Sequence, residues 1–506
     1  MQSQRRRLWI ASTILETGGE RRSFDSGTPR CPVLSKILLP SLRSIAAMDI
    51  SDGSRGRGAF AEALRLPASG DLLPSAPSGA VRSIATARWA AGIFLLVVVL
   101  QRFAIPGTPV ALLIPAIIIW CAIGLARRLV VFDQTRLTFW VAAAGITATA
   151  MPLQSQLVQE STISLGSWGL FMIVWLPFTL RLVERSNVTY LTMLRYVTII
   201  ATCLGVLCIL MIGSALAGLP YRDWFGEFVP ISLQLTDFVI TYPISYGSSI
   251  YRANAWIGLE PSMVSAQLGL GLLAAIFTRA KGWIIIILVI ALATTVSGSG
   301  VAIAGVGLVV MMLHRSRRLV LRYAPVAVAA GIAASLTTFG SLLLQRTNEI
   351  QQRGSSASLR ALEPYSFLYP NWISDLAGLI LGYGPGSSQR IITDSGIMGL
   401  LVPTPIKIFF EYGLFPGAIL AAFLLVCYWG GPSRAFGISL LVSLWALQPG
   451  TTTMVIVAPL LALVTLWSPR VEMPIEDIET PKRSRRLRRS LAAGGVNTPT
   501  RLGREG

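Results

Sequence analysis

A series of twelve apolar segments constrains this chain more than any other feature. Most of them approach the roughly 20 residues that a helix needs to cross a bilayer. Only 13% of the chain is charged and 53% of it is hydrophobic, which leaves little polar surface for a soluble protein of this length. The sequence therefore predicts an all-α, polytopic membrane helix bundle of about twelve transmembrane helices. The predicted spans lie near residues 86–104, 108–126, 137–153, 166–183, 196–218, 261–279, 282–297, 300–314, 323–344, 404–428, 434–450 and 451–468.

Two basic tails flank this predicted membrane domain, which covers residues 85–470. Residues 1–84 are rich in Arg, Ser, Gly and Pro without a sustained periodicity, and residues 471–506 are also strongly basic. Such segments cannot bury enough apolar surface to fold, so both are predicted to be disordered. We expect no cleavable signal peptide, because no apolar stretch follows the cluster Arg5 to Arg7. Met48 is an alternative start of translation.

The positions of the basic residues predict how the bundle is oriented. With the N-terminus in the cytoplasm, nearly all short loops that carry Lys or Arg face the cytoplasm, as the positive-inside rule requires. Both tails then lie inside as well. Because the basic residues flank apolar spans, the net charge of +19 is interpreted as contact with anionic membrane lipids and not with nucleic acid. The cytoplasmic basic loops are residues 127–136, 181–195, 279–281, 315–322 and 434.

Two of the predicted outer loops are long, one from Leu219 to Leu259 and the other from Gln345 to Pro403. Loops held by a rigid scaffold often carry function. Arginines are disfavoured on the outer side, so those that occur there call for a functional reason. The outer arginines are Arg222, Arg252, Arg346, Arg353, Arg360 and Arg390.

Arg252 and Glu260 lie where the first long loop runs into an apolar span. Ions at such a boundary are functional suspects, since placing them there is costly. Arg252 could grip a phosphate or pyrophosphate with its planar fork of donors, and Glu260 could orient that arginine or accept a proton. The simpler interpretation is an interfacial anchor followed by a helix start, which the sequence Glu260-Pro261-Ser262 also suits.

The second long loop combines arginines with aromatic residues. Tyr365 and Trp372 belong to this run, which suits the binding of sugars and phosphates but is equally typical of an aromatic belt at the membrane surface. The glycines of Gly382 to Gly386 predict a tight turn that could cradle phosphate oxygens. Lys407 and Glu411 lie four residues apart in the next span, share one helical face and are predicted to pair. Ser297 to Gly300 are most simply a tight hairpin between two spans.

Metal binding is not predicted. The chain has a single histidine, His314, which falls beside the cytoplasmic arginines, and no His/Cys/Asp cluster has the spacing of metal ligands.

Four of these motifs resemble the superfamily of bacterial O-antigen polymerases and O-antigen ligases, which includes exopolysaccharide repeat-unit polymerases. Their order, spacing and predicted topology together carry the resemblance, which covers roughly Tyr251 to Gly417. The motifs are Arg252 to Ser262, the hairpin Ser297-Gly-Ser299-Gly300, Ser358-Leu-Arg360 followed by Gly382-Tyr-Gly384-Pro385-Gly386, and Phe410-Glu411-Tyr412-Gly413-Leu414-Phe415-Pro416-Gly417.

The resemblance implies an enzyme of the bacterial inner membrane that acts at its periplasmic face. It would move a growing glycan from undecaprenyl pyrophosphate onto the next lipid-linked repeat unit by inverting transfer, without a metal or other cofactor. A chain-length regulator and a flippase are partners that it suggests. The candidate catalytic residues are Glu260, Arg252 and Arg360, with Glu363, Asp394 and Glu411 as alternative bases. The candidate substrate-binding residues are Arg346, Arg353, Arg390, Tyr365, Trp372, Lys407 and Glu411.

Two alternatives remain open at this point. Ligases of the superfamily attach finished glycan to lipid A-core and use a histidine in the large periplasmic loop, but the loop from Gln345 to Pro403 has none. This absence favours a polymerase. A polysaccharide-related membrane transporter is the alternative that is not an enzyme. Transporters often show two similar halves, whereas this sequence shows no internal repeat.

Overall fold

The computed structural model describes residues 78–108, 110–235, 238, 240–244, 248, 250–314, 317–335, 358–396, 402–447 and 452–468. The predicted tail 471–506 lies outside this description, as do residues 1–77 of the predicted tail 1–84. Residues 78–84 already belong to the first described helix, α3 (Ser78–Leu100).

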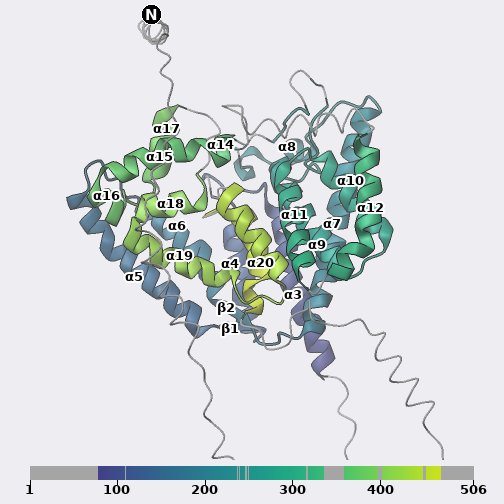
Figure 1. Cartoon of the computed structure of the whole chain (residues 1–506), viewed down its shortest axis with the longest axis horizontal. Helices are drawn as coiled ribbons and strands as arrows, with labels where there is room; N and C mark the ends of the chain where they lie inside the picture. The colour runs from purple at the N-terminus through teal and green to yellow at the C-terminus, as the bar shows by residue number, and fades with distance from the viewer. Residues whose placement is uncertain are drawn as a thin grey trace, which may run out of the picture. The chain divides into compact units, whose positions relative to one another are not determined.

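The described chain is mostly helical (Figure 1). The first half contains α3, α4 (Leu113–Ala126), α5 (Gln134–Leu157), α6 (Leu165–Trp175), the 3₁₀ turn η1 (Leu176–Thr179) and α7 (Asn187–Leu216). The first long loop contains the short helices α8 (Trp224–Phe228) and η2 (Ile231–Leu233). Four further helices follow it: α9 (Pro261–Phe277), α10 (Gly282–Thr294), α11 (Gly298–Leu313) and α12 (Arg317–Ser335).

The second long loop also forms helices. These are α14 (Ser358–Ala361), α15 (Glu363–Ser374), α16 (Leu376–Leu381) and α17 (Ser387–Ser395). The C-terminal part consists of α18 (Thr404–Tyr412), α19 (Leu414–Tyr428), α20 (Arg434–Val442), the π-helix η4 (Ser443–Leu447), α21 (Met454–Leu463) and the 3₁₀ turn η5 (Thr465–Trp467).

Every predicted span contains helix, so the all-α class is confirmed. The predicted span 404–428 is nevertheless two helices, because the chain breaks at Gly413, whose φ of +70° favours glycine. Two helical stretches of the described chain, Val81–Leu100 and Asn187–Leu216, are long and apolar enough to cross a membrane. The shorter apolar helices have 10–17 residues. The bundle of twelve membrane spans therefore stays a prediction.

Several of the basic loops meet at one end of the helices. Strand β1 (Val130–Phe132) pairs antiparallel with β2 (Leu180–Leu182), which joins the loop after α4 to the loop after η1. Arg82, near the start of α3, donates to the Arg128 carbonyl (3.2 Å). At the other end of the described chain, Arg136 donates to the Ser468 carbonyl (3.1 Å). The first and last described helices therefore have their outer ends beside this strand pair.

The two long loops lie at the opposite end (Figure 1). Leu235 of the first loop donates to the carbonyl of Arg102, just after the end of α3, and a helix of this length spans about 35 Å. Thr162, which follows α5, donates to the Tyr383 carbonyl of the second loop (2.9 Å). Because α3 and α5 both begin near the strand pair, their far ends carry both loops.

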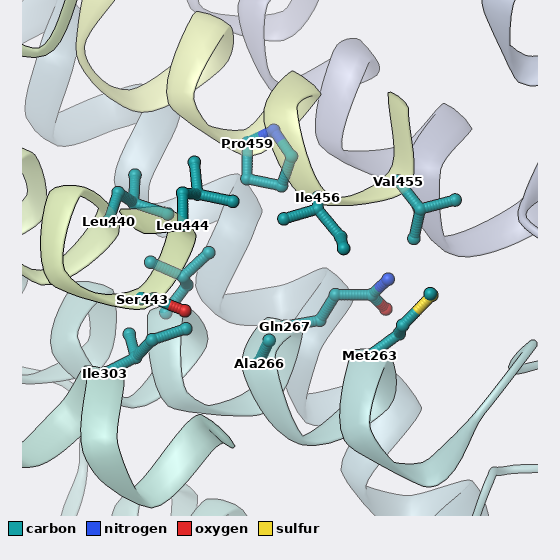
Figure 2. Close-up of a pocket in the computed structure, with 11 residues that line it drawn as sticks. Met263, Ala266, Gln267, Ile303, Leu440, Ser443, Leu444, Val455, Ile456 and Pro459 are labelled. Atoms are coloured by element: carbon teal, nitrogen blue, oxygen red, sulfur yellow. The ribbon is translucent and has the colours of Figure 1, made fainter. Parts of the chain in front are cut away.

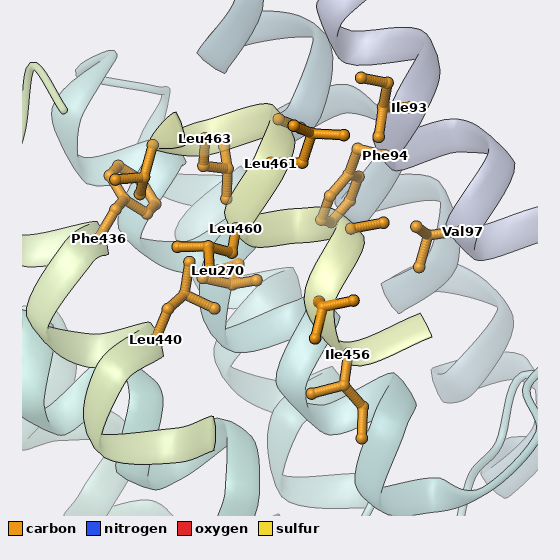
Figure 3. Packing of buried hydrophobic residues seen from close by; sticks show 14 of the residues in the cluster. Ile93, Phe94, Val97, Leu270, Phe436, Leu440, Ile456, Leu460, Leu461 and Leu463 are labelled. Atoms are coloured by element: carbon orange, nitrogen blue, oxygen red, sulfur yellow. The ribbon is translucent and has the colours of Figure 1, made fainter. Parts of the chain in front are cut away.

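The main core lies between α3, α7, α9, α11, α20 and α21. All ten residues of α21 are buried, and its leucines contact Ile93 and Phe94 of α3 on one side and Phe436 of α20 on the other (Figure 3). A helix that is apolar all round belongs in a core. A smaller second core under the second loop includes Leu368, Tyr383 and Phe410.

Candidate functional site

Glu260 is the residue at which the first long loop becomes helix α9. Its backbone is extended (φ −141°, ψ 152°), Pro261 follows as the first helical residue, and the Glu260 carbonyl accepts from Met263 N (3.1 Å). The side chain is 7% exposed, and Ser262 Oγ donates to its Oε2 (2.9 Å). The carboxylate thus lies at the positive end of the helix dipole, which stabilises negative charge.

The hairpin Ser297 to Gly300 lies directly against this helix start. Ser299 Oγ donates to the Ser262 carbonyl (2.6 Å), and Gly300 N donates to Ser265 Oγ (3.1 Å). A Cβ at Gly300 would overlap the backbone of Ser265, so only glycine allows α11 to approach α9 this closely. Two motifs that are separate in sequence therefore form one site, which we call the Glu260 cluster: Glu260, Ser262, Ser297 and Ser299.

Arg252 is held in the segment that leads to Glu260. Its N donates to the Tyr242 carbonyl (2.8 Å), its Nε donates to the Pro243 carbonyl (3.1 Å), and its guanidinium lies 5.7 Å from the centre of the Tyr242 ring. The buried Asn254 fixes the next turn by accepting from Trp256 N (3.0 Å). Hydrogen bonds therefore hold both the backbone at Arg252 and the turn that follows it.

Gln101 and Arg102 position this segment, and the sequence interpretation missed both. Arg102 is 1% exposed, donates two hydrogen bonds to Asp223 (2.7 and 2.6 Å) and a third to the Trp256 carbonyl (2.7 Å). Gln101 Oε1 accepts from Leu259 N (3.2 Å). A paired, fork-to-fork arginine and carboxylate is a strong and directional contact. The available signal was a Gln-Arg pair inside the predicted span 86–104.

Lys407 and Glu411 pair as their spacing predicts, with 3.6 Å between Nζ and Oε1. Glu411 is 1% exposed, and its Oε1 also accepts a short hydrogen bond from Ser388 Oγ. The lysine neutralises the buried charge, and the serine donates a hydrogen bond to it. A carboxylate that is buried away from water requires such partners. We call Lys407, Glu411, Ser388 and the loop Gly382 to Gly386 the Glu411 cluster.

The glycine loop is hydrogen-bonded to the break between α18 and α19. Tyr383 N donates to the Phe410 carbonyl and Gly384 N to the Glu411 carbonyl, both at 2.9 Å. Gln154 Nε2 reaches the same Glu411 carbonyl (3.1 Å). A Cβ at Gly382 would overlap this backbone, and its φ is +84°. These two loop N–H groups already bind protein carbonyls, so they do not serve as a cradle for phosphate.

The other predicted residues are dispersed over the second loop. Arg390 is exposed on α17, lies 3.7 Å from Asp394 and donates to Thr162 Oγ1 (2.8 Å). Tyr365 and Trp372 of α15 pack on the second core, where burial raises the pKa of Tyr365. Glu363, at the start of the same helix, accepts from Ser358 Oγ (2.9 Å).

Some predicted residues are only partly within the description. The backbone of Arg360 lies in α14, but its side chain is outside the described part. Arg346 and Arg353 lie wholly outside the described residues. Within residues 78–468 as far as they are described, no three His, Cys, Asp or Glu side chains come together as metal ligands would.

His314 lies far from the Glu260 cluster. Helix α11 begins beside Ser262, and His314 follows its other end, where Arg434 Nη1 lies 3.4 Å from His314 Nε2. The single histidine of the chain thus accompanies the basic residues and neither carboxylate cluster.

The π-helix η4 connects the two clusters. It contacts both α11 and α18, and Thr404 Oγ1 at the start of α18 donates to the Leu444 carbonyl (2.8 Å).

No known protein family, curated protein or solved structure matches this chain.

Proposed function

We propose that the protein is a membrane glycosyltransferase that polymerises oligosaccharide repeat units carried on undecaprenyl pyrophosphate. One observation carries this proposal: motifs from separate segments of the chain meet in pairs. Glu260 to Ser262 contact Ser297 to Gly300, and Gly382 to Gly386 contact Glu411 to Gly413. These pairs are the same motifs that resemble the O-antigen polymerase and ligase superfamily.

The arrangement at the Glu260 cluster suits glycosyl transfer from a lipid pyrophosphate. A hydroxyl of the acceptor sugar attacks the anomeric carbon of the donor glycan, and the bond from that carbon to the pyrophosphate oxygen breaks. Glu260 takes the proton of the attacking hydroxyl. Arg252, with Arg360 from the second loop, stabilises the negative charge that develops on the departing pyrophosphate. One attack on the face opposite the leaving group inverts the anomeric configuration.

Glu260 is a better candidate for the general base than Glu411. Glu411 is 1% exposed and shares one oxygen between Lys407 and Ser388, while its carbonyl holds the glycine loop. We therefore assign Lys407 and Glu411 to holding the scaffold and not to binding the substrate. Glu260 instead lies where the first long loop enters the bundle, next to the segment that carries Arg252.

The arrangement of the helix ends supports a location in the bacterial inner membrane. Both long loops lie at one end of the bundle, and the start of α3 and the end of η5 lie at the other with Arg128, Arg136 and Arg181. Under the positive-inside rule, this arrangement supports a periplasmic position for the long loops and a cytoplasmic position for the opposite end of the bundle.

Glycan length is the measurement that tests the proposal. A strain that lacks the gene is complemented with the wild type, with Arg252→Ala or with Arg222→Ala, and protein levels are compared. Arg222 is a matched control, since it is an exposed arginine of the same loop that pairs with Glu227 (2.6 Å). We expect long chains with the wild type and the control, and single repeat units with Arg252→Ala.

Other outcomes separate the alternatives. Full-length polymer that stays on its lipid carrier in the deletion strain would indicate a ligase. Unchanged glycan in that strain would contradict both enzymes and favour a transporter. Wild-type polymer with Arg252→Ala would remove this arginine from the mechanism.

A further inference from the structure

Pockets of the described chain differ in the chemistry of their linings. The pocket between α9, η4 and α21 is lined by apolar side chains except for Gln267 and Ser443 (Figure 2). Gln267 is buried, and neither its Oε1 nor its Nε2 has a hydrogen-bond partner among the described residues. A wider pocket of about 510 Å³ lies beside the strand pair of β1 and β2 and contains two arginines. Because fixed charge restricts what a pocket can bind, the lining of this second pocket is more informative about a ligand.

Arginines and exposed apolar side chains meet in the second pocket, which we call the arginine pocket. Arg82 Nη2 donates to the Arg128 carbonyl (3.2 Å), so the two arginines are neighbours in space. The apolar part of the lining is only partly covered, since Phe132 is 47% and Val183 is 44% exposed. The described lining residues are Arg82, Leu125, Arg128, Val130, Val131, Phe132 and Val183. Such a surface suits a ligand with an anionic head and an apolar body.

The carboxylates of Asp133 and Glu184 follow lining residues in the sequence but bind elsewhere. Asp133 Oδ1 accepts from Arg136 N (3.1 Å), and Asp133 Oδ2 lies 3.8 Å from Arg181 Nε. Glu184 Oε1 accepts from Thr189 Oγ1 (3.0 Å). Neither carboxylate is among the described lining residues of the arginine pocket. The described lining is therefore positively charged and attracts an anion.

Arg128 has a backbone conformation that favours glycine. Its φ is +53°, and it follows the end of α4, where its N donates to the Leu125 carbonyl and Leu129 N donates to the Gly124 carbonyl (both 2.9 Å). Helices often end with a glycine in this left-handed conformation, because other side chains are strained there. The helix dipole favours a cation at this end, but that attraction extends over the last turn and does not require the strained position. Strained residues cluster at sites that bind ligands.

The arginine pocket lies where the two most membrane-like helices begin. The apolar stretches Val81–Leu100 and Asn187–Leu216 are each long enough to cross a bilayer. Ser83 Oγ and Thr189 Oγ1 are 2.6 Å apart, so the two stretches start side by side. Arg82 is the second residue of the first stretch. The pocket is therefore at the depth at which lipid headgroups meet the hydrocarbon layer.

We infer that the arginine pocket binds an anionic phospholipid. Arg82 and Arg128 hold the headgroup phosphate, for which the planar guanidinium is well suited. Phe132 and Val183 contact the start of an acyl chain, which a free phosphate lacks. Basic pockets between membrane helices on the cytoplasmic side are suited to such headgroups. The pocket lies at the end of the bundle opposite the long loops (Figure 1). The inference thus rests on the proposed membrane location and not on the proposed reaction.

Lipid binding to the purified full-length protein tests this inference. The protein in neutral detergent is titrated with phosphatidylglycerol, and bound lipid is counted by native mass spectrometry. Arg128→Gly is the main variant, because glycine suits the φ of +53° and the protein should fold at least as well as the wild type. Arg279→Gly is the matched control. Arg279 follows the end of α9, also has a φ of +53°, is exposed and does not line the arginine pocket.

We expect Arg128→Gly to bind phosphatidylglycerol about tenfold more weakly than the wild type, as for the loss of a hydrogen bond to a charged group. Arg279→Gly should bind like the wild type. Phe132→Ser, which removes the exposed ring, should also weaken binding. Phosphatidylcholine with the same acyl chains should not bind at these concentrations, and excess inorganic phosphate should not displace the bound lipid.

Three results would overturn the inference. Equal losses in Arg128→Gly and Arg279→Gly would indicate a diffuse attraction between a basic surface and anionic lipid. Wild-type binding by Arg128→Gly would remove the pocket as the site. Displacement of the lipid by inorganic phosphate would indicate a phosphate site. Because no glycan is measured, these results are independent of whether the protein polymerises repeat units.

Discussion

The Glu260 and Glu411 clusters contain the same kinds of groups but surround the carboxylate differently. Each combines a carboxylate, a serine hydroxyl and a glycine that lets two backbone segments touch. At Glu411 a lysine and a serine meet one oxygen, and the main-chain carbonyl of the same residue accepts two more hydrogen bonds. The Glu260 carboxylate lies at the start of helix α9. The segment of the first long loop that contains Arg252 leads into this helix start.

The difference shows how to distinguish a carboxylate that stabilises the fold from one that is a candidate for catalysis, even where the sequence motifs are similar. A carboxylate whose charge is neutralised inside the protein contributes to stability, and removing it leaves a buried lysine without its partner. A carboxylate at a helix N-terminus is stabilised by the helix dipole. The first kind should fail by unfolding and the second by loss of activity.

The largest effect is expected at Glu411. Glu411→Ala leaves Lys407 largely buried and unpaired, which should lower the free energy of unfolding by about 3–5 kcal/mol. Thermal unfolding of the detergent-purified protein measures this change. The double variant Lys407→Met with Glu411→Leu should recover much of the loss, because it removes both charges. A Glu411→Ala protein as stable as the wild type would show that the pair is not part of the scaffold.

Glu260→Gln should behave in the opposite way. The substitution keeps the shape and the hydrogen bond from Ser262, so Tm should stay near that of the wild type, while the rate of the proposed polymerisation should fall about 10²- to 10⁴-fold. The rate is measured with purified lipid-linked repeat units. Glu227→Gln, in the same loop, is the control and should retain activity. If Glu260→Gln polymerises at the wild-type rate, Glu260 is not the base.

Gly413→Ala tests the contact that closes the Glu411 cluster. Gly413 has a φ of +70°, and a Cβ there would overlap the backbone of Ile380 and Leu381. We expect a loss of about 1–3 kcal/mol in the free energy of unfolding, as for other overpacked sites. Gly305→Ala on α11 is the control, since a Cβ at Gly305 meets nothing within 4 Å. Equal Tm values for the two variants would mean that the glycine loop does not lie against the break.

The smallest effect concerns alkaline pH. Burial, with Asp375 nearby, raises the pKa of Tyr383 above its usual value of 10.0. Above pH 10 the unfolded chain therefore loses this proton before the folded chain does, so the free energy of unfolding falls as pH rises. Tyr383→Phe should be less sensitive between pH 9 and about 11 than Tyr369→Phe, which changes an exposed tyrosine. Identical pH profiles would contradict the assignment.

Much of the fold could be predicted because the apolar segments can be read directly from the sequence. Each predicted span contains helix, and the i,i+4 spacing of Lys407 and Glu411 was enough to predict their pairing. Within the candidate site, the helix start at Glu260-Pro261-Ser262 and the hairpin at Ser297 to Gly300 follow from local rules for proline and glycine. The positions of both long loops were also apparent from composition.

Other features could not be found in this way. The break at Gly413 splits one apolar stretch into two helices at the point where the glycine loop lies against it. Gln101 and Arg102 acquire their role from partners in the first long loop, Asp223, Trp256 and Leu259. Gln267 gave no signal in sequence, since one amide in an apolar helix is informative only when its surroundings are known.

The sequence by itself determined which segments are helical and apolar, where the loops lie and which local pairs form, because these depend on neighbours within a few residues. The tertiary structure alone decided which motifs meet and which polar groups stay unsatisfied in the core. Those outcomes depend on the burial of side chains and on contacts between segments that are not neighbours in sequence, such as Ser262 with Ser299 and Gln154 with Glu411. Burial and partners set the free energy of a charge or an amide, and neither is encoded at a single position.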